Sequence, residues 1–195
     1  YPRSGNTWCR MFVATYINLI NNQENIDAVF KEDKFQLETG RIVSSRSWID
    51  DQLGIDSSDL TKEELDNIRR YIGLSEKIFD DQPRYHKVHD SFYKPPDHEK
   101  FLVPYKNCKG IIYMIRHPAD VAISLSNFLN ISFTESVEFL RNKNASLAGN
   151  KNKIVKQVYQ YLGTWEHHVK SWTEQKKIPI LVIRYEDLNR NQKIF

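Results

Sequence analysis

The chain has 195 residues, 40% of them hydrophobic and 12% aromatic, so it can bury one substantial core, and a single domain over residues 1–195 is the default expectation. Its net charge of +3 argues against a protein that binds nucleic acid through a basic surface, and no apolar run is long enough to predict a membrane span. Two cysteines, Cys9 and Cys108, form neither a disulfide framework nor a metal-ligand pattern; they favour a reducing compartment, which predicts a cytoplasmic location.

The first predicted element is a helix over Trp8–Ile20, which follows directly on a glycine-containing loop, YPRSGNTW. The run WCRMFVATYINLI is apolar on most faces and lacks Gly and Pro, which is typical of a well-buried helix. Loops of this kind normally follow a strand, so we expect that the natural N-terminus lies before Tyr1. Residues 21–57 are polar and mixed in character, and we expect irregular structure there.

A short helix and a short strand are predicted next. Thr61 and Glu64 form a capping box, and the helical spacing of the apolar residues after it predicts a helix that ends near Gly73. The sequence RYHKVHD, from Arg84, predicts a short strand that runs into a loop. The pair Pro95–Pro96 then ends regular structure.

The clearest strand lies in KGIIYMIRHP, where Ile111 to Ile115 form a continuous apolar run. Such a run is typical of a parallel strand that is buried on both faces. Pro118 follows at a position that suits the first turn of a helix, ADVAISLSNFLN. This segment therefore predicts a strand, a turn and a helix in succession.

The last third of the chain predicts two helices and a buried strand. Ser132 and Thr134 offer caps for a helix in SVEFLRNK, a longer helix is predicted from about Lys153 to Glu174, and PILVIRY reads as a buried strand. Strands that alternate with helices predict an α/β fold of three layers, with a central parallel sheet flanked by helices.

The opening loop has the composition of a site for phosphate or sulfate. YPRSGNTW supplies a glycine for close backbone approach, two hydroxyls and a guanidinium, and the helix after it directs its N-terminal amides toward the loop. An ordinary turn before a core helix is the alternative interpretation. The Gly-Lys-Ser/Thr of nucleoside triphosphatases is missing, which argues against magnesium-bound ATP.

Four motifs together resemble one family. YPRSGNTW resembles the 5′-phosphosulfate loop, Tyr-Pro-Lys-Ser-Gly-Thr-Thr-Trp, of the cytosolic-type sulfotransferases, and IRHPADVAISLSNF resembles their 3′-phosphate segment. KVH is similar to the Lys-Thr-His that contains the family's catalytic base, and GTWEHHVKSW with LVIRYEDL makes the fourth match. The matches keep the family's order from Tyr1 to Leu188, so the chain is identified as a member of this family, which has a P-loop-like fold.

The resemblance implies the donor 3′-phosphoadenosine 5′-phosphosulfate (PAPS), the product adenosine 3′,5′-bisphosphate (PAP), and no metal. It implies that Arg116 forks onto the 3′-phosphate and that Ser124 adds a hydroxyl, although a surface salt bridge is the alternative for Arg116. Arg3 stands where the family has lysine; it can stabilise charge on the leaving oxygen but cannot plausibly act as an acid. The other donor-site residues implied are Ser4, Gly5, Asn6 and Thr7 along the phosphosulfate and Trp8 on the adenine, with a core role as the alternative for Trp8.

The catalytic residues implied by the resemblance are His89 and Lys87, together with Arg3. His89 is the candidate general base, because the acceptor must lose a proton and imidazole titrates nearest to neutral pH. Lys87, two residues earlier, matches the family's lysine that holds the transferring group, with a solvated surface lysine as the alternative. Tyr185 sits where the family contacts the adenine, and Asp187 could cap the following helix.

Two further functions stay open at this point: a P-loop kinase or hydrolase of nucleoside triphosphates, and a non-catalytic module that binds adenine nucleotides. The family's C-terminal Arg-Lys-Gly segment and its dimerisation motif would lie beyond Phe195, so we expect a chain truncated at both ends and a possible homodimer. The acceptor is a small molecule with a hydroxyl or amine. Several aromatic residues point to an aromatic or lipophilic acceptor, namely Trp48, Phe92 and Tyr93, together with Phe128 and Phe133 as candidates that could equally be core.

Overall fold

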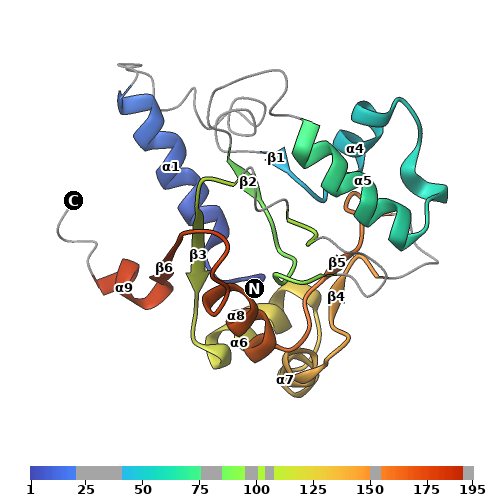
Figure 1. Cartoon of the computed structure of the whole chain (residues 1–195). Coiled ribbons are helices and arrows are strands. Elements are labelled where there is room, and N and C mark those ends of the chain that lie inside the picture. The colour runs from blue at the N-terminus through green and yellow to red at the C-terminus, as the bar shows by residue number, and fades with distance from the viewer. Residues whose placement is uncertain (21–40, 76–84, 95–100, 104–107, 150–154, 191–195) are drawn as a thin grey trace.

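The computed structural model describes residues 1–20, 41–75, 85–94, 101–103, 108–149 and 155–190. The chain has an α/β fold in which parallel strands are flanked by helices, as the sequence predicts (Figure 1). Within these ranges no helix is both long enough and apolar enough to cross a bilayer. The irregular structure predicted for residues 21–40 and the end of regular structure predicted at Pro95–Pro96 fall outside the described residues.

The centre of the fold is a parallel pair of strands, β3 (Ile111–Ile115) and β6 (Ile180–Arg184). The register pairs Ile111 with Ile180 and runs to Ile115 with Arg184. Both strands were predicted, and both carry β-branched residues that suit a pleated sheet. A second parallel pair joins β1 (Arg41–Ile42) to β2 (His86–Lys87), which confirms the short strand expected in RYHKVHD.

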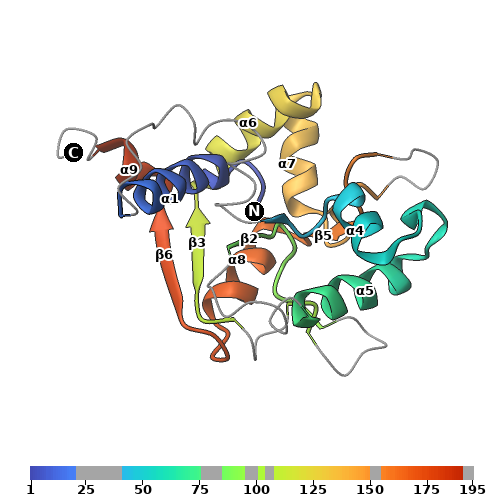
Figure 2. The ribbon, with the colours of Figure 1, turned by 90° about the horizontal axis from the view of Figure 1, so that it is seen from above.

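Helices cover both faces of β3. Successive side chains of a strand point to opposite sides, so neighbouring residues of β3 contact different helices. Tyr113 packs with Trp172 of α8 (Trp165–Thr173) on one face. On the other face the Met114 methyl lies beside Gly5, directly before α1 (Asn6–Ile20). Figure 2 shows α1 lying across these strands, while α8 lies near β3 in both views of the ribbon.

The burial of these strands is less complete than the sequence predicts. Ile112 is 42% exposed, Leu181 58% and Val182 42%. Within the described ranges β6 pairs only with β3, and α1 covers only part of the face to which Met114 points. The expectation of strands buried on both faces is therefore wrong for these residues.

Helices α6 (Pro118–Leu129) and α7 (Phe133–Arg141) form a hairpin over a second part of the core. Ser132 caps α7 in a reciprocal capping box with Glu135, as predicted, whereas Thr134 lies inside the helix. The hairpin buries a cluster of apolar side chains that includes Tyr1, Val121, Leu125, Leu140 and Leu162.

Helix α5 (Lys62–Ser75) confirms the predicted helix and its Thr61–Glu64 capping box. The preceding segment contradicts the expectation of irregular structure, because α4 (Arg46–Leu53) and a short 3-10 helix, η1 (Ser57–Asp59), form there. Ile49 is fully buried against the apolar side of α5, and this tertiary contact stabilises a helix with little apolar pattern of its own. Gly54 ends α4 in the left-handed conformation.

The long helix predicted from about Lys153 to Glu174 forms only in its second half, as α8, and the prediction is wrong for residues 155–164. Residues 155–163 form no helix, and β5 (Gln160–Tyr161) pairs antiparallel with β4 (Ser146–Leu147). Gly163 adopts a positive φ of 67°, and Thr164 then caps α8 by accepting a hydrogen bond from the backbone of His167. The apolar residues of this segment pack in different core clusters: Val158 in one, Leu162 and Trp165 in another. Their spacing resembles that of one helix face although they do not share a helix.

Candidate active site

The opening loop turns sharply into α1. Arg3 and Gly5 both have positive φ, 67° and 100°, and the carbonyl of Gly5 accepts the first helical hydrogen bond, from Cys9 at 3.0 Å. The amides that precede Cys9 in the first turn have no partner within the helix. They carry the positive end of the helix dipole, which favours an anion at this position.

The loop touches the helix that carries the second predicted motif. Arg3 Nε donates to Ser124 Oγ at 3.0 Å, and the Arg3 guanidinium lies 4.9 Å from the centre of the Phe128 ring. Arg116 Nη1 donates to the carbonyl oxygen of Arg3 at 3.2 Å. The structure thus brings Arg3 together with Arg116 and Ser124, which lie 113 and 121 residues later in the sequence.

Three buried polar atoms in this contact region have no hydrogen-bond partner within the described part of the chain: Ser4 Oγ, Asn6 Oδ1 and Arg116 Nε. Ser4 is only 2% exposed, so water does not satisfy its hydroxyl at the surface. An unsatisfied buried polar group costs about 1–3 kcal/mol. Two of the three atoms, Ser4 Oγ and Arg116 Nε, are donors, which suits an anionic ligand.

Tyr185, just after the end of β6, packs against the opening loop. It begins α9 (Tyr185–Arg190), directly after β6, and the Arg116 guanidinium lies 4.5 Å from the centre of its ring. The same ring packs on Gly5 so closely that a Cβ at that position would stand 2.7 Å from Tyr185 Cδ2. Arg116 and Gly5 are therefore both held by Tyr185.

Replacing Gly5 with alanine is expected to lower the free energy of unfolding by more than about 2 kcal/mol, through positive-φ strain and the clash with Tyr185. We expect affinity for PAP to fall at least about tenfold, because the loop must shift. Gly54→Ala is the matched control: its φ is 70°, nothing lies within 4 Å of the added Cβ, and its cost is about 1 kcal/mol with unchanged affinity. Equal effects of the two changes in denaturant unfolding and calorimetry would contradict a special role for Gly5.

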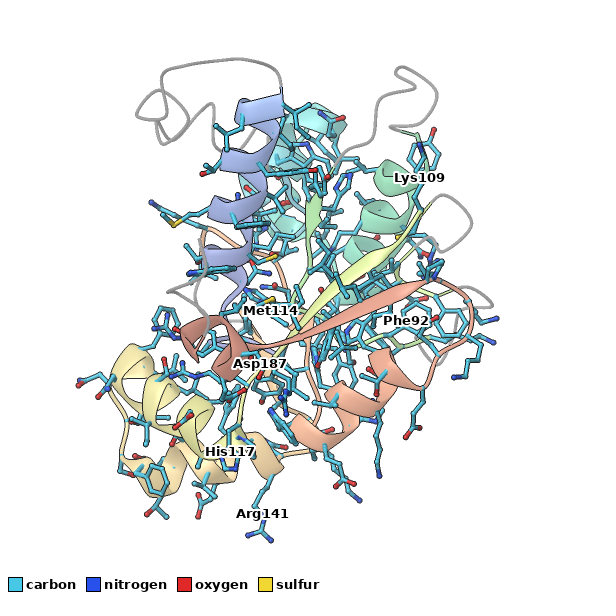
Figure 3. The ribbon with its side chains drawn as sticks, turned by 90° about the vertical axis from the view of Figure 1, so that its left-hand side faces the viewer. Phe92, Lys109, Met114, His117, Arg141 and Asp187 are labelled. Carbon is cyan, nitrogen blue, oxygen red and sulfur yellow. The ribbon has the colours of Figure 1, made fainter. Side chains whose placement is uncertain are left out.

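A hydrogen bond between His117 and Glu186 links the segments that follow the two central strands. Glu186 Oε1 accepts a hydrogen bond from the His117 amide at 2.7 Å, and this bond lowers the pKa of Glu186. His117 Nδ1 accepts from the amide of Ala119 and so caps α6. Figure 3 shows Met114, His117 and Asp187 near the ends of β3 and β6. Asp187 does not cap α9; it lies inside the helix and pairs with Arg184 at 2.8 Å.

Trp8 and Thr7 lie on the first turn of α1 and are exposed, with 37% of Trp8 accessible. The Trp8 ring stacks on Phe12, with 5.7 Å between ring centres and an angle of 3°. This geometry does not support a core role for Trp8. Its outward ring leaves one face available for an aromatic ligand.

Lys87 is the last residue of β2, and His89 follows two residues later; both lie beside α1. Burial, and then the positive charge of Lys87, hold the pKa of His89 well below its ordinary value of 6.5. Burial, and then the charge of Arg10, lower the pKa of Lys87 to about 8. His89 is therefore neutral at pH 7, and Lys87 is charged for the most part.

Arg10 is a site residue that the sequence interpretation missed. It lies on α1 one turn after Asn6, and its charge acts on both Lys87 and His89. Burial lowers its own pKa. Its place one turn beyond the loop was a usable signal, because a side chain there shares the face of the first turn.

The aromatic residues considered for the acceptor lie in different places. Phe92 stacks on Phe101 and contacts Trp172 in the core, and Trp48 packs against the cluster around Ile49. Phe128, in contrast, is exposed beside Arg3. Of this group, Phe128 is the aromatic side chain that adjoins the loop.

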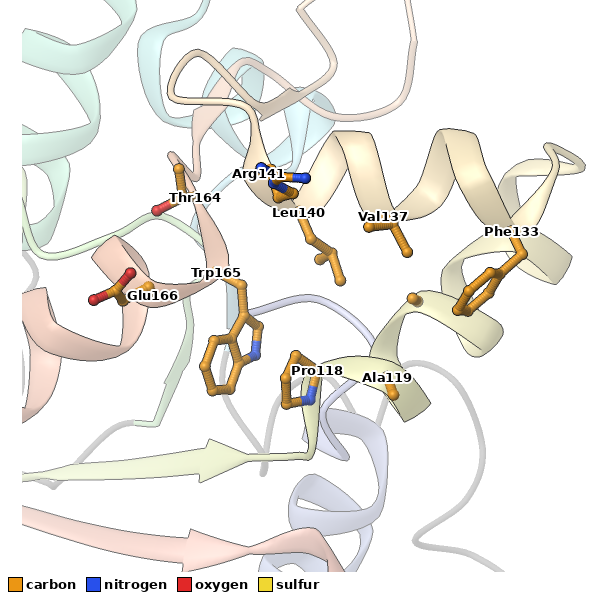
Figure 4. Close-up of a pocket in the computed structure, with 10 residues that line it drawn as sticks. Pro118, Ala119, Phe133, Val137, Leu140, Arg141, Thr164, Trp165 and Glu166 are labelled. Carbon is orange, nitrogen blue, oxygen red and sulfur yellow. The ribbon is translucent and has the colours of Figure 1, made fainter.

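A cavity of about 430 Å³ lies apart from these residues (Figure 4). It is bounded by α6, α7 and the start of α8, and its lining includes Pro118, Ala122, Val137, Leu140 and Trp165. Phe133, one of the acceptor candidates, lines it, whereas none of the predicted donor-site or catalytic residues does. Ser124 lies on another side of α6, roughly 200° around the helix from Ala122.

In the described part of the chain there is no group of three or more His, Cys, Asp or Glu side chains arranged to hold a metal ion. The predicted site residues instead offer guanidinium, ammonium, hydroxyl and backbone donors, together with one neutral imidazole. Such a set binds anions and can accept one proton.

Comparison with known proteins is consistent with this chemistry. A family model described as "Sulfotransferase domain" matches residues 1–193. The chain is 29% identical over 200 residues to the human protein Sulfotransferase 1E1, and the match covers 98% of this chain and 52% of the relative. The chain thus spans about half the length of that relative. No solved structure matches the chain significantly.

Proposed function

The chain belongs to the sulfotransferase family, and from this premise we propose that the protein transfers a sulfuryl group from PAPS to the hydroxyl or amine of a small acceptor. The observation that carries the proposal is the contact of the opening loop with the Arg116–Ser124 segment, around the unpartnered donors of Ser4 and Arg116. PAPS would supply the activated sulfuryl group. It carries one phosphate at the 3′ position and the phosphosulfate at the 5′ position of the same nucleoside.

The residues present fit a donor with two separated anionic groups. The first-turn amides of α1 and the Ser4 hydroxyl would hold the 5′-phosphosulfate. Arg116 would direct its unpartnered Nε toward the 3′-phosphate. Ser124 Oγ accepts its hydrogen bond from Arg3, so its own hydrogen is available to the same phosphate.

His89 would act as the general base. Its low pKa keeps the imidazole unprotonated at neutral pH, so a ring nitrogen can accept the proton that the acceptor hydroxyl loses. In the same step the new bond from acceptor oxygen to sulfur forms, and the bond from sulfur to the bridging phosphate oxygen breaks. Arg3 stays protonated and would stabilise the charge left on that oxygen.

Lys87 would hold the transferring group through its positive charge, and this predicts the alkaline side of the pH profile. The amine is protonated below its pKa of about 8, so kcat/KM should fall as pH rises through that value. Lys87→Arg keeps the charge and should remove this fall up to about pH 10. Lys170→Arg, at an exposed ion pair with Glu166, is the control and should leave the profile unchanged. A fall near pH 8 that persists in Lys87→Arg would contradict the role of Lys87.

We propose an aromatic or lipophilic acceptor on the strength of Phe128, which lies exposed beside Arg3. A cytoplasmic location is proposed on the free state of Cys9 and Cys108. The function is tested with the full-length protein, sulfur-labelled PAPS and a panel of phenols and alkyl alcohols, alongside calorimetry with PAP and with MgATP. We expect label transfer to at least one phenol and tighter binding of PAP. Phosphoryl transfer from ATP, or preference for MgATP, would contradict the proposal.

A further inference from the structure

A buried ion pair stands directly beside His89. Arg69, from α5, forks onto Asp90, with 3.2 Å from Nη1 to Oδ1 and 2.6 Å from Nη2 to Oδ2. Arg69 is 2% exposed and Asp90 1%. Asp90 Oδ1 also accepts from the amide of Tyr161 at 3.1 Å. The residue that follows the candidate base is thus fixed by three hydrogen bonds to its side chain.

The same guanidinium makes three further contacts. Arg69 Nε donates to the carbonyl of Val43 at 3.4 Å, and Nη1 donates to the carbonyl of Tyr159 at 3.1 Å. Asp66, one turn earlier on α5, lies 3.6 Å from Nη1. Burial lowers the pKa of Arg69, but the charge and hydrogen bonds of Asp90 outweigh this effect, so the guanidinium stays charged.

The backbone at His89 is held from the other side by α8. His168 Nε2 donates to the carbonyl of His89 at 2.9 Å, and Trp172 Nε1 donates to the carbonyl of Asp90 at 3.0 Å. Burial keeps His168 neutral by lowering its pKa, so its Nδ1 accepts from the Tyr113 hydroxyl at 2.9 Å. The position of His89 is therefore defined relative to both α5 and α8.

The imidazole of His89 itself makes no hydrogen bond within the described ranges. Its placement depends on the backbone that carries it rather than on a ring partner. A buried ion pair is weak support for stability, because well-packed apolar residues often serve as well. An apolar pair, however, has no donor for the carbonyls of Val43 and Tyr159 and no acceptor for the amide of Tyr161.

We infer that Arg69 and Asp90 are a positioning pair, which fixes the backbone at His89 so that its imidazole meets the acceptor in the reactive geometry. This inference rests on the proposed function, because it assumes that His89 is the base. The pair touches neither donor nor acceptor; it acts through His89. A misplacement of about 1 Å in such a group costs up to about 100-fold in rate.

Asp90→Asn in the full-length protein tests the inference. The amide keeps the size and one acceptor oxygen, but it loses the charge and the fork. We expect kcat to fall about tenfold or more, with the KM for PAPS and the Kd for PAP changed less than about twofold. Amide hydrogen exchange of residues 88–92 should become at least about tenfold faster relative to the other protected amides.

Leu65→Ala is the matched stability control, because Leu65 lies on α5 one turn before Arg69 and packs in the apolar cluster around Ile49. It should destabilise the protein by about 2–5 kcal/mol without lowering kcat where the protein is folded. If Leu65→Ala lowers kcat as much as Asp90→Asn, or if exchange at 88–92 is unchanged in Asp90→Asn, the positioning role is wrong. Arg69→Lys, which keeps the charge without the fork, should repeat the loss of kcat and replaces Asp90→Asn if that variant does not fold.

His89→Ala, measured in parallel, separates this inference from the proposed function. Loss of turnover in His89→Ala together with normal turnover in Asp90→Asn would reject the positioning pair and leave the proposed function intact. Normal turnover in His89→Ala would reject His89 as the base. The exchange measurement still decides whether Arg69 and Asp90 fix the backbone at His89.

Discussion

Replacing His89 with alanine is expected to lower kcat for sulfuryl transfer by about 100-fold or more, the usual contribution of a positioned general base. His89 is neutral at pH 7 because burial and the charge of Lys87 depress its pKa, so the wild-type ring is ready to accept a proton. The alanine variant leaves the acceptor proton to water. The Kd for PAP should stay within about twofold, because His89 lies outside the contact of the loop with Arg116.

His167→Ala is the control for this prediction. His167 lies exposed on α8, and its ring packs beside Gly163 and Tyr161, with 6.2 Å between its centre and that of the Tyr161 ring. We expect it to turn over as the wild type does. Both variants are compared by steady-state kinetics with labelled PAPS and one phenol. Comparable turnover in the two variants would remove His89 from the mechanism.

Arg116→Ala is expected to weaken PAP binding by about 100-fold, which corresponds to about 2.7 kcal/mol. The change removes the unpartnered Nε and also the hydrogen bond that supports the carbonyl of Arg3. Loss of the guanidinium also frees the face of Tyr185 on which it lies. The donor site should therefore lose both a phosphate ligand and part of the support for its loop.

Arg184→Ala is the matched control for Arg116. Arg184 ends the neighbouring strand β6, but its side chain is 67% exposed and pairs with Asp187. Exposed pairs contribute little to stability. Calorimetry should give wild-type affinity for PAP in this variant. Equal losses in the two arginine variants would mean that PAP responds to net positive charge and not to Arg116.

Local signals in the sequence predicted the fold where they were self-contained. The capping boxes at Thr61 and Ser132 predict helices that form, and the apolar run from Ile111 to Ile115 predicts a strand that forms. Helix α4 was missed because its burial through Ile49 depends on α5. The long helix was predicted because apolar spacing was given more weight than Gly163 and Thr164, which mark a break and a new cap.

The parts of the site that lie within one sequence motif could be predicted. The parts that the fold brings together from distant segments could not. The loop and Arg116 were identified from residue patterns alone, and the structure places them in contact. The Arg69–Asp90 pair was missed because its partners come from distant segments and no spacing encodes them. Arg10 was missed although it lies one turn beyond the loop, because its effect on Lys87 depends on a segment far away in the sequence. The exposure of Leu181 was missed for a similar reason: a strand's own sequence does not specify what covers it.

The most direct test of the central claim is a crystal structure of the full-length protein with PAP. We expect the 5′-phosphate against the amides at the start of α1 and the 3′-phosphate within hydrogen-bond distance of Arg116 and Ser124. A nucleotide bound elsewhere, or one whose 3′-phosphate contacts neither of these residues, would contradict the claim.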